Sequence, residues 1–315
     1  MPYYIAGIDV HKKMLAVAVA DVAVEGDFHF ERLKVGTSPI QLRALADWLV
    51  EREVEEVVME STAQYWRPVW EALERYWRPT RRMRADARPV SGTLHLAQAQ
   101  SNRAAGGRKR DFPDAERLVK RLVAQELILS FVPDAEQRLW RTVMRRKYQI
   151  TRSRVQLHNR LESLLEEAHI KISSVVSDLL GTSARRMLHA VGDGETDPTA
   201  LAALADSRLR ATPDQLRDAF GACADLHPVY RRLVKLTLDE LRLIEDQLAQ
   251  LDQQMADLLT AHHDAVQRLA EVPGLGVDSA QQIIAEAGAS AAAFPSANSL
   301  RPGWVPAQAM RKLQA

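Results

Sequence analysis

A single carboxylate, Asp9, follows the apolar start of the chain and limits what this segment can become. One apolar run covers residues 3–8, and a second covers residues 14–20, beyond the polar stretch 11–13. Both runs have the length and composition of buried strands. Burying a carboxylate among apolar residues is costly unless a partner compensates its charge. We therefore expect a strand pair in which Asp9 has a positive partner, and a metal ion is the leading candidate.

The elements expected after this strand pair follow the order of a ribonuclease H-like core. They are strands over residues 27–35 and 54–59 and helices over residues 40–53 and 65–76. Ser38 or Thr37 is expected to cap the first helix, and Ser61 or Thr62 the second. Glu60 comes directly after the strand that we expect at the centre of the sheet. Many α/β domains share this order, so the order alone does not identify a function.

From residue 131 onward the sequence predicts helices. A long helix is expected over residues 134–169, several short ones over residues 173–224, and a second long helix over residues 228–262. The last carries apolar residues three and four apart over about four heptads, which is typical of a coiled coil. Its seam is Val234, Thr237, Leu241, Ile244, Leu248, Leu251, Met255 and Leu258. The pattern leaves open whether the two long helices pair within one chain or join two chains.

The charges are unevenly distributed, although the net charge is only +1. Residues 78–110 contain nine Arg or Lys and one acid, and residues 138–160 contain eight Arg or Lys and no acid. Such stretches indicate a polyanionic partner, with nucleic acid as the leading candidate and solvated arginine-rich faces as the alternative. The candidate phosphate-binding residues are Arg108, Lys109, Arg110, Arg141, Arg145, Arg146, Lys147, Arg152 and Arg154.

The remaining composition excludes some classes of protein. The single cysteine, Cys223, excludes a disulfide framework and a cysteine-rich metal site within one chain. No apolar run approaches the roughly 20 residues that span a bilayer, and residues 1–20 lack the pattern of a signal peptide. We therefore expect a cytoplasmic protein.

A glycine-bracketed turn at Gly274 and Gly276 precedes a helix expected over residues 278–287. Backbone N–H groups at such a turn and helix start can contact a phosphate, as in a helix-hairpin-helix motif. An ordinary turn between helices is an equally good interpretation of so short a motif.

Four acids are candidate metal ligands and catalytic residues: Asp9, Glu60, Asp111 and Asp114. Asp111 and Asp114 flank the start of a helix expected from about residue 113 and, three apart, share one face. On a ribonuclease H-like core the four carboxylates could hold two Mg²⁺ ions, which prefer hard oxygen ligands and act on phosphodiesters. Taken singly, the last three acids could equally be residues bordering or capping helix starts. His11 could be a ligand, although we expect a solvated turn residue.

Three motifs carry a resemblance to a known family. They are Gly7 to Lys13 (GIDVHKK), Met59-Glu60-Ser61-Thr62 with Tyr65-Trp66, and Arg108 to Glu116 (RKRDFPDAE). They resemble the DEDD-type insertion-sequence transposases, which have a RuvC-like nuclease domain followed by helices and a serine-bearing domain. The resemblance implies a recombinase that uses Mg²⁺, acts on DNA at element ends and targets, and forms a homo-oligomer through the coiled coil. An RNA encoded by the element can guide target choice in this family.

The resemblance also sets the expected domain organisation. A RuvC-like nuclease domain is expected over residues 1–130, an all-α coiled-coil region over 131–264, and a truncated C-terminal transposase domain over 265–315. The serine-alanine-glycine motif of the family is not found after Leu300, so recombination could be impaired. A nuclease resembling a Holliday-junction resolvase, and a non-catalytic nucleic-acid-binding remnant, remain the alternatives.

Overall fold

The chain is divided into two compact units, which are described separately. Unit 1 covers Met1–Ala135 and unit 2 covers Glu136–Ala315. The structure is a computed structural model that describes residues 2–24, 27–61, 63–79, 92–98 and 111–290. Within these ranges, no helix is both long enough and apolar enough to cross a membrane.

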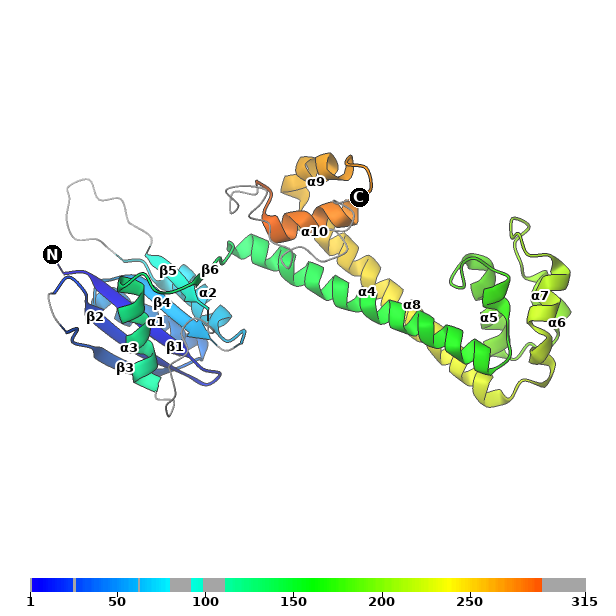
Figure 1. Cartoon of the computed structure of the whole chain (residues 1–315), viewed down its shortest axis with the longest axis horizontal. Coiled ribbons are helices and arrows are strands. Elements are labelled where there is room, and N and C mark those ends of the chain that lie inside the picture. Colours follow the sequence, from blue (N-terminus) through cyan, green and yellow to red (C-terminus); the bar gives the residue numbers. More distant parts are fainter. Residues whose placement is uncertain (1, 25–26, 62, 80–91, 99–110, 291–315) are drawn as a thin grey trace. The chain divides into compact units, whose positions relative to one another are not determined.

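Unit 1 contains a mixed six-stranded sheet with the strand order β3-β2-β1-β4-β5-β6 (Figure 1). Its strands are β1 (Tyr4–Val10), β2 (Met14–Asp21), β3 (Glu31–Gly36), β4 (Val54–Ser61), β5 (Thr93–Ala97) and β6 (Leu129–Ser130). β1, β4 and β5 run parallel, whereas β2, β3 and β6 are antiparallel to their neighbours. β1 and β2 form a hairpin, β3 lies at the outer edge of this hairpin, and parallel strands lie on its other side. This is the ribonuclease H-like arrangement that the sequence predicts.

Each face of this sheet is covered by helices. α1 (Pro39–Glu51) and α2 (Trp66–Tyr76) lie on one face, where the larger apolar side chains of the strands form the core. α3 (Asp111–Val123) covers the other face. Small residues such as Gly7, Ala16 and Ala18 form much of the second face, so α3 approaches the backbone of the sheet closely. Asp9 belongs to this second face, because side chains alternate along a strand.

The N-terminal cap of α1 is the one that the sequence predicts, whereas that of α2 is not. Ser38 caps α1 and forms the reciprocal hydrogen bonds of a capping box with Gln41. The expected cap of α2 by Ser61 or Thr62 is wrong, because Tyr65 occupies the cap position without a side-chain hydrogen bond. Ser61 instead forms hydrogen bonds with Ala63, within the connection to α2. β3 also begins four residues later than predicted, at Glu31.

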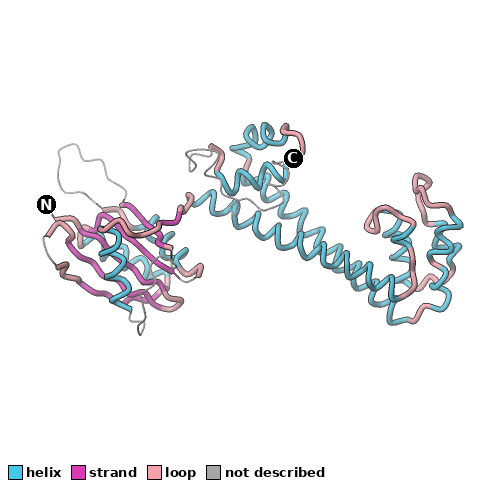
Figure 2. Tube along the Cα trace, viewed as in Figure 1, coloured by secondary structure: helices cyan, strands magenta, loops and turns pink. Residues whose placement is uncertain are grey.

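Unit 2 is built on two long antiparallel helices, α4 (Ala135–Glu167) and α8 (Pro228–Leu258) (Figure 1). Lys147 of α4 forms ion pairs with Asp252 of α8, and seven residues later Arg154 pairs with Glu245. These contacts fix the antiparallel register within one chain. Figure 2 shows that helix is the only regular structure in the described part of this unit.

Smaller helices pack at each end of the α4–α8 pair. At one end, α5 (Thr182–Asp193), α6 (Pro198–Ala203) and α7 (Pro213–Ala219) form an apolar core with α4 and α8. Two short 3-10 helices, η1 (Ile172–Ser174) and η2 (Gly221–Asp225), belong to this end as well. At the other end, η3 (Thr260–His262), α9 (His263–Ala270) and α10 (Val277–Ala287) follow α8. There Trp140 and Met144 of α4 pack against α8, α9 and α10.

Candidate metal and nucleic-acid site

Asp9 and Glu60 are in-register neighbours on the parallel strands β1 and β4. Paired residues on adjacent strands lie about 4.8 Å apart between backbones and point to the same face. Asp9 is 7% exposed, and Glu60 is partly buried beside it. Two carboxylates therefore share one small region at the carboxyl ends of these strands.

His11 also belongs to this region. Its Nε2 atom lies 3.0 Å from Oδ2 of Asp9, and its side chain is only partly exposed. His11 thus lies in the β1–β2 turn, as the sequence predicts, but its imidazole rests against Asp9 and is not fully solvated. The β1–β2 hairpin folds the backbone back after Val10, where the N–H of His11 donates to the carbonyl of Met14, and this keeps the imidazole beside the strand end.

α3 brings its first turn to the same face of the sheet. The helix begins at Asp111, whose side chain lies outside the described part of the structure, and continues through Asp114. Asp114 forms an ion pair of 2.7 Å with Arg117 one turn later. In the residues that the structure describes, no three His, Cys, Asp or Glu side chains gather closely enough to hold a metal ion. The structure thus brings Asp9 and Glu60 together, and it does not gather Asp114 with them.

The donor chemistry at Asp9 and Glu60 fits a hard divalent cation. Mg²⁺ is commonly held by one or two carboxylates and keeps several waters, so two adjacent carboxylates are a sufficient protein contribution for one ion. A bound cation would also offset the cost of holding Asp9 in a buried position beside a second carboxylate. The residues present are thus suited to the metal that this arrangement implies.

The basic residues predicted to bind phosphate differ in whether they already form hydrogen bonds or ion pairs within the protein. Arg108, Lys109 and Arg110 lie outside the described residues. Arg141 is buried, and its guanidinium donates to the carbonyl oxygens of Ala285 and Glu286 at the end of α10. Lys147 forms ion pairs with Asp252 and Asp278. Both side chains therefore help to assemble unit 2.

The other predicted basic residues of α4 lie nearer the surface. Arg146 and Arg152 are exposed on this helix. Arg145 is also exposed, although it forms an ion pair of 3.3 Å with Glu286. Arg154 is partly buried and contacts Glu245 at 3.2 Å. Three exposed arginines thus remain on the surface of α4 where a polyanion could reach them.

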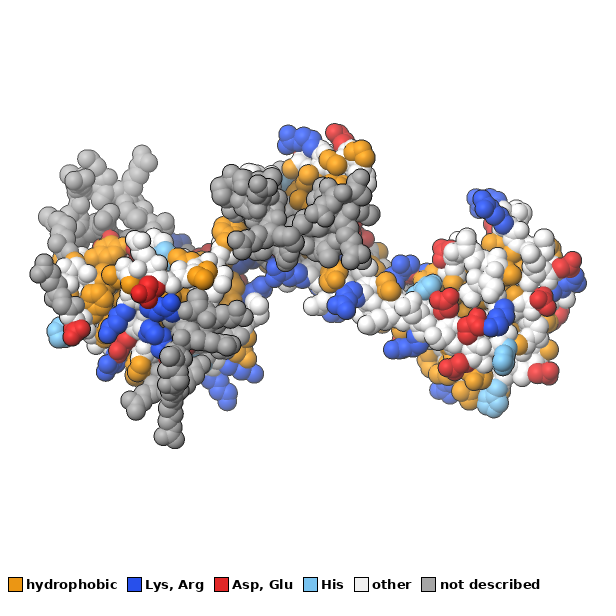
Figure 3. All heavy atoms as spheres, in the orientation of Figure 1, with side chains coloured by type: hydrophobic (Ala, Val, Ile, Leu, Met, Phe, Trp, Pro, Cys, Tyr) orange, Lys and Arg blue, Asp and Glu red, His pale blue; other side chains and the backbone are white. Residues whose placement is uncertain are grey.

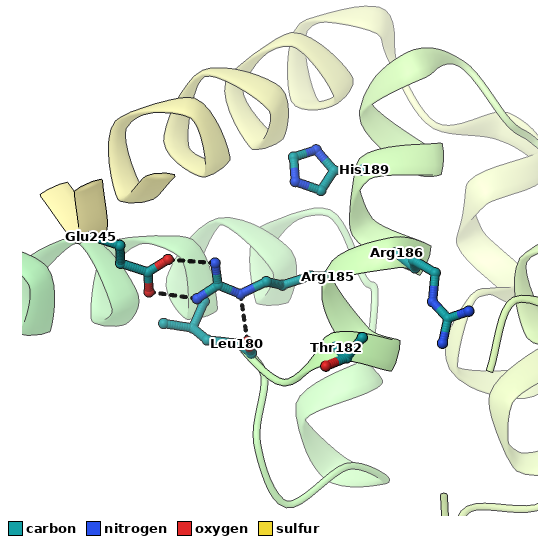
Figure 4. Close-up of a pocket in the computed structure, with 6 residues that line it drawn as sticks. All are labelled: Leu180, Thr182, Arg185, Arg186, His189 and Glu245. Atoms are coloured by element: carbon teal, nitrogen blue, oxygen red, sulfur yellow. Dashed lines mark hydrogen bonds and ion pairs between the residues drawn. The ribbon is translucent and has the colours of Figure 1, made fainter. Parts of the chain in front are cut away.

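A pocket of about 570 Å³ lies beside Glu245, between α5 and α8 (Figure 4). Arg185 of α5 extends toward Glu245 and donates two hydrogen bonds of 2.6 Å to its carboxylate, whereas Arg186 points away from it. The hydrogen bonds from Arg185 hold the pKa of Glu245 below its usual value. Because Arg154 contacts the same carboxylate, two cations share one anion at this edge of the pocket.

The glycine turn occurs where the sequence predicts it. Gly274 has a left-handed backbone with φ of 86°, and Gly276 is the N-cap of α10. α9, which the sequence analysis did not predict, precedes the turn, so the turn joins two helices. The first N–H groups of α10 are therefore presented at its start, as at any helix N-terminus.

Sequence reasoning missed a group of cations on β3. Lys34 and Arg32 approach the ring of Phe112 in α3, with distances of 5.4 Å and 5.9 Å to its centroid. Their alternation along the strand was the available signal. This alternation alone did not show that Arg32 and Lys34 face α3, because the face to which they point depends on the pairing register of β3 with β2.

Comparisons with known proteins give one family match. The model of the IS110-type DEDD family, described as a transposase, matches residues 6–170. Among curated proteins, none matches the sequence. The chain is similar to the solved structure of T. thermophilus RuvC in complex with a Holliday junction substrate, with 12% identity and a TM-score of 0.29, over 41% of this chain and 99% of that one. A second structure, of Thermus thermophilus RuvC, has 14% identity and a TM-score of 0.28, over 40% of this chain and 99% of that one.

Proposed function

Because the chain belongs to the IS110-type DEDD transposase family, we propose that it binds the DNA of an insertion sequence and performs Mg²⁺-dependent phosphodiester chemistry on it. The observation that carries this proposal is the in-register pair of Asp9 and Glu60 on adjacent parallel strands. A buried carboxylate with a second carboxylate beside it has no role in an apolar core, but it has one in binding a cation.

The proposal gives each acid a role. Asp9 and Glu60 supply the oxygen ligands held by the sheet, and Asp111 and Asp114 supply those from the start of α3. Mg²⁺ bound by these carboxylates would activate the attacking water or hydroxyl and stabilise the leaving oxygen. His11 orients the carboxylate of Asp9, whose Oδ2 lies 3.0 Å from its Nε2 atom. Arg117 holds Asp114 until the ligand set is complete.

The proposed DNA contacts are electrostatic. Arg108, Lys109 and Arg110 directly precede Asp111 in the sequence and would meet phosphates next to the acids. On α4, Arg145, Arg146 and Arg152 would contact the backbone, because phosphate contacts position a duplex without reading its sequence. In this proposal Arg141, Lys147 and Arg154 support the surface, and the turn at Gly274 and Gly276 offers backbone N–H groups to a further phosphate.

Two further partners complete the proposal. A guide RNA would use the same kind of phosphate contacts as DNA. A second copy of the chain would pair through the long helices, and exposed apolar residues on α8 support this. They are Val229, Leu233, Leu236 and Leu243.

A cleavage assay with Asp9→Asn tests the proposed chemistry. The full chain is incubated with branched DNA and with element-end DNA, with and without Mg²⁺. We expect metal-dependent cutting by the wild type, none by Asp9→Asn or Glu60→Gln, and unchanged DNA binding by both variants. Asp47→Asn is the matched control, because Asp47 is an exposed acid on α1, which covers the other face of the sheet.

The outcomes separate the alternatives. Unchanged cleavage by Asp9→Asn would overturn the assignment of the acids. Equal cutting of branched DNA without element ends would favour a resolvase-like nuclease. Binding without any cutting by the wild type would favour a non-catalytic nucleic-acid-binding protein.

A further inference from the structure

Three cations lie along β3 and α3, on the face of the sheet that carries Asp9. They are Arg32, Lys34 and Lys120, and we call them the β3–α3 basic strip. Figure 3 shows Lys and Arg side chains, with a few acids among them, in the area where Figure 1 draws α3. None of the three belongs to the basic stretches that stand out in the sequence.

Strand register places Lys34, one member of the strip, in line with the acids. Ala16 of β2 is paired with Lys34 on one side and with Asp9 on the other, and Asp9 is paired with Glu60. Lys34 therefore belongs to the same cross-strand row as the two carboxylates and points to the same face. Two strand spacings separate it from Asp9, so their backbones are about 10 Å apart.

Aromatic rings hold the cations in place. The ring of Phe112 lies near both Arg32 and Lys34, and the ring of Phe30 lies 5.8 Å from the ammonium of Lys120. A cation that rests against a ring face is held by electrostatic attraction while its polar end still faces water. This favours one orientation of side chains that would otherwise be mobile.

The cations of the strip lie at the surface of unit 1. Glu116 forms an ion pair of 2.6 Å with Arg32. Lys34 and Lys120 are both exposed. A polyanion that approaches the pair of carboxylates can therefore reach Lys34, and Lys120 lies on α3 over the same face of the sheet.

We propose that the β3–α3 basic strip binds the backbone phosphates of the DNA strand held at the acids, next to the phosphate that is cut. This inference rests on the proposed function and adds a substrate-positioning surface to it. The carboxylates of Asp9 and Glu60 repel a polyanion. Lys34, whose backbone lies about 10 Å from that of Asp9, is roughly one Debye length away at 0.1 M salt and offsets this repulsion where the strand enters. Arg32 and Lys120 extend the contact surface away from the acids.

The salt dependence of binding measures the phosphate contacts directly. Each phosphate contact contributes about 0.9 to the slope of log K against log salt. With full-length protein carrying Asp9→Asn, so that the DNA is not consumed, we expect Lys34→Ala and Lys120→Ala each to lower that slope by about 1 for labelled branched DNA. Lys34→Arg should restore the slope, because it restores the charge.

Arg43→Ala is the matched control. Arg43 is an exposed cation on α1, on the opposite face of the sheet, and it also rests on an aromatic ring, at 5.4 Å from Tyr76. Its loss removes one charge and one ring contact, as in Lys34→Ala, but should leave the slope unchanged. Circular dichroism of every variant verifies the fold.

The readouts separate this inference from the proposed function. An unchanged slope in Lys34→Ala and Lys120→Ala, with the wild type binding DNA, overturns the strip and leaves the chemistry standing. A reduced slope in a protein whose wild type never cuts supports the strip and overturns the chemistry. A slope reduced only for RNA of the same sequence, or reduced equally by Arg43→Ala, also overturns the strip.

Discussion

Gly7 of β1 lies directly beneath Ala115 of α3: a Cβ atom at position 7 would come within 2.1 Å of the carbonyl oxygen of Ala115. The missing side chain is what allows α3 to lie against the sheet next to Asp9.

Gly7→Ala should therefore destabilise unit 1. Either α3 or the strand must shift to admit the methyl group, and overpacking of this kind costs about 1–3 kcal/mol. Urea denaturation followed by circular dichroism measures the loss. Gly221→Ala is the control, because no atom lies within 4 Å of a Cβ at that position. Equal stabilities of the two variants would contradict the close packing of α3.

Arg141→Ala should release α10 from α4. Its buried guanidinium donates to the carbonyl oxygens of Ala285 and Glu286, and hydrogen bonds from charged groups contribute about 1.5–3 kcal/mol each. We expect faster hydrogen exchange of the α10 amides and little change in α5. Arg145→Ala should have a small effect, because Arg145 is exposed where it pairs with Glu286. Similar exchange rates of the α10 amides in both variants would show that the buried guanidinium of Arg141 does not hold α10 against α4.

Glu245→Gln should destabilise unit 2 in a pH-dependent way. Hydrogen bonds from Arg185 lower the pKa of Glu245 in the folded state. The stabilisation is therefore present above the pKa of the unfolded state and is lost as the pH falls through the lower, folded-state pKa. We expect a difference of about 1 kcal/mol at pH 7.

Urea titrations from pH 7 to pH 3 follow that difference, which should shrink in acid. Glu240→Gln, an exposed residue of the same helix, is the control. A difference that does not change with pH would exclude an ionic contribution from Glu245.

Leu236→Asp with Leu243→Asp should dissociate an oligomer formed through α8. These side chains are 49% and 58% exposed and lie seven residues apart, so they present one face of the helix. Light scattering should show a lower mass with the helical circular dichroism retained. Gln253→Asp, an exposed position on a different side of α8, is the control for added charge. If the mass stays the same in the double variant, this face of α8 does not join two chains.

The sequence was sufficient for features that depend on local pattern. The alternation of apolar runs around residues 11–13 predicted the β1–β2 hairpin, and Ser38 before Pro39 predicted the start of α1. The heptad pattern predicted α8, since helical periodicity persists over many turns. The order of these elements then indicated the fold.

Features that depend on distant partners could not be predicted. Arg141 was predicted to contact phosphate because it lies in the basic stretch 138–160. Its partners in α10 could not be foreseen, because the bonded groups are 144 residues apart in the sequence. The β3–α3 basic strip depends on the register between β2 and β3, and a shift of one residue would turn Lys34 to the other face. For the candidate site, the strand position of Asp9 and Glu60 followed from sequence, whereas the contact of His11 with Asp9 followed only from the structure.

The hydrogen bonds from Gln137 and Arg141 to the end of α10 also have a consequence for the order of folding. During synthesis, α4 leaves the ribosome long before its partners Ala285 and Glu286 are made, since 144 to 149 residues separate the bonded groups. Trp140 and Met144, which pack in one cluster with Ala285, therefore lack part of their apolar core during that interval. Closure of this end of unit 2 is therefore a late and slow step, because contacts between such distant residues form only after a large loop has closed.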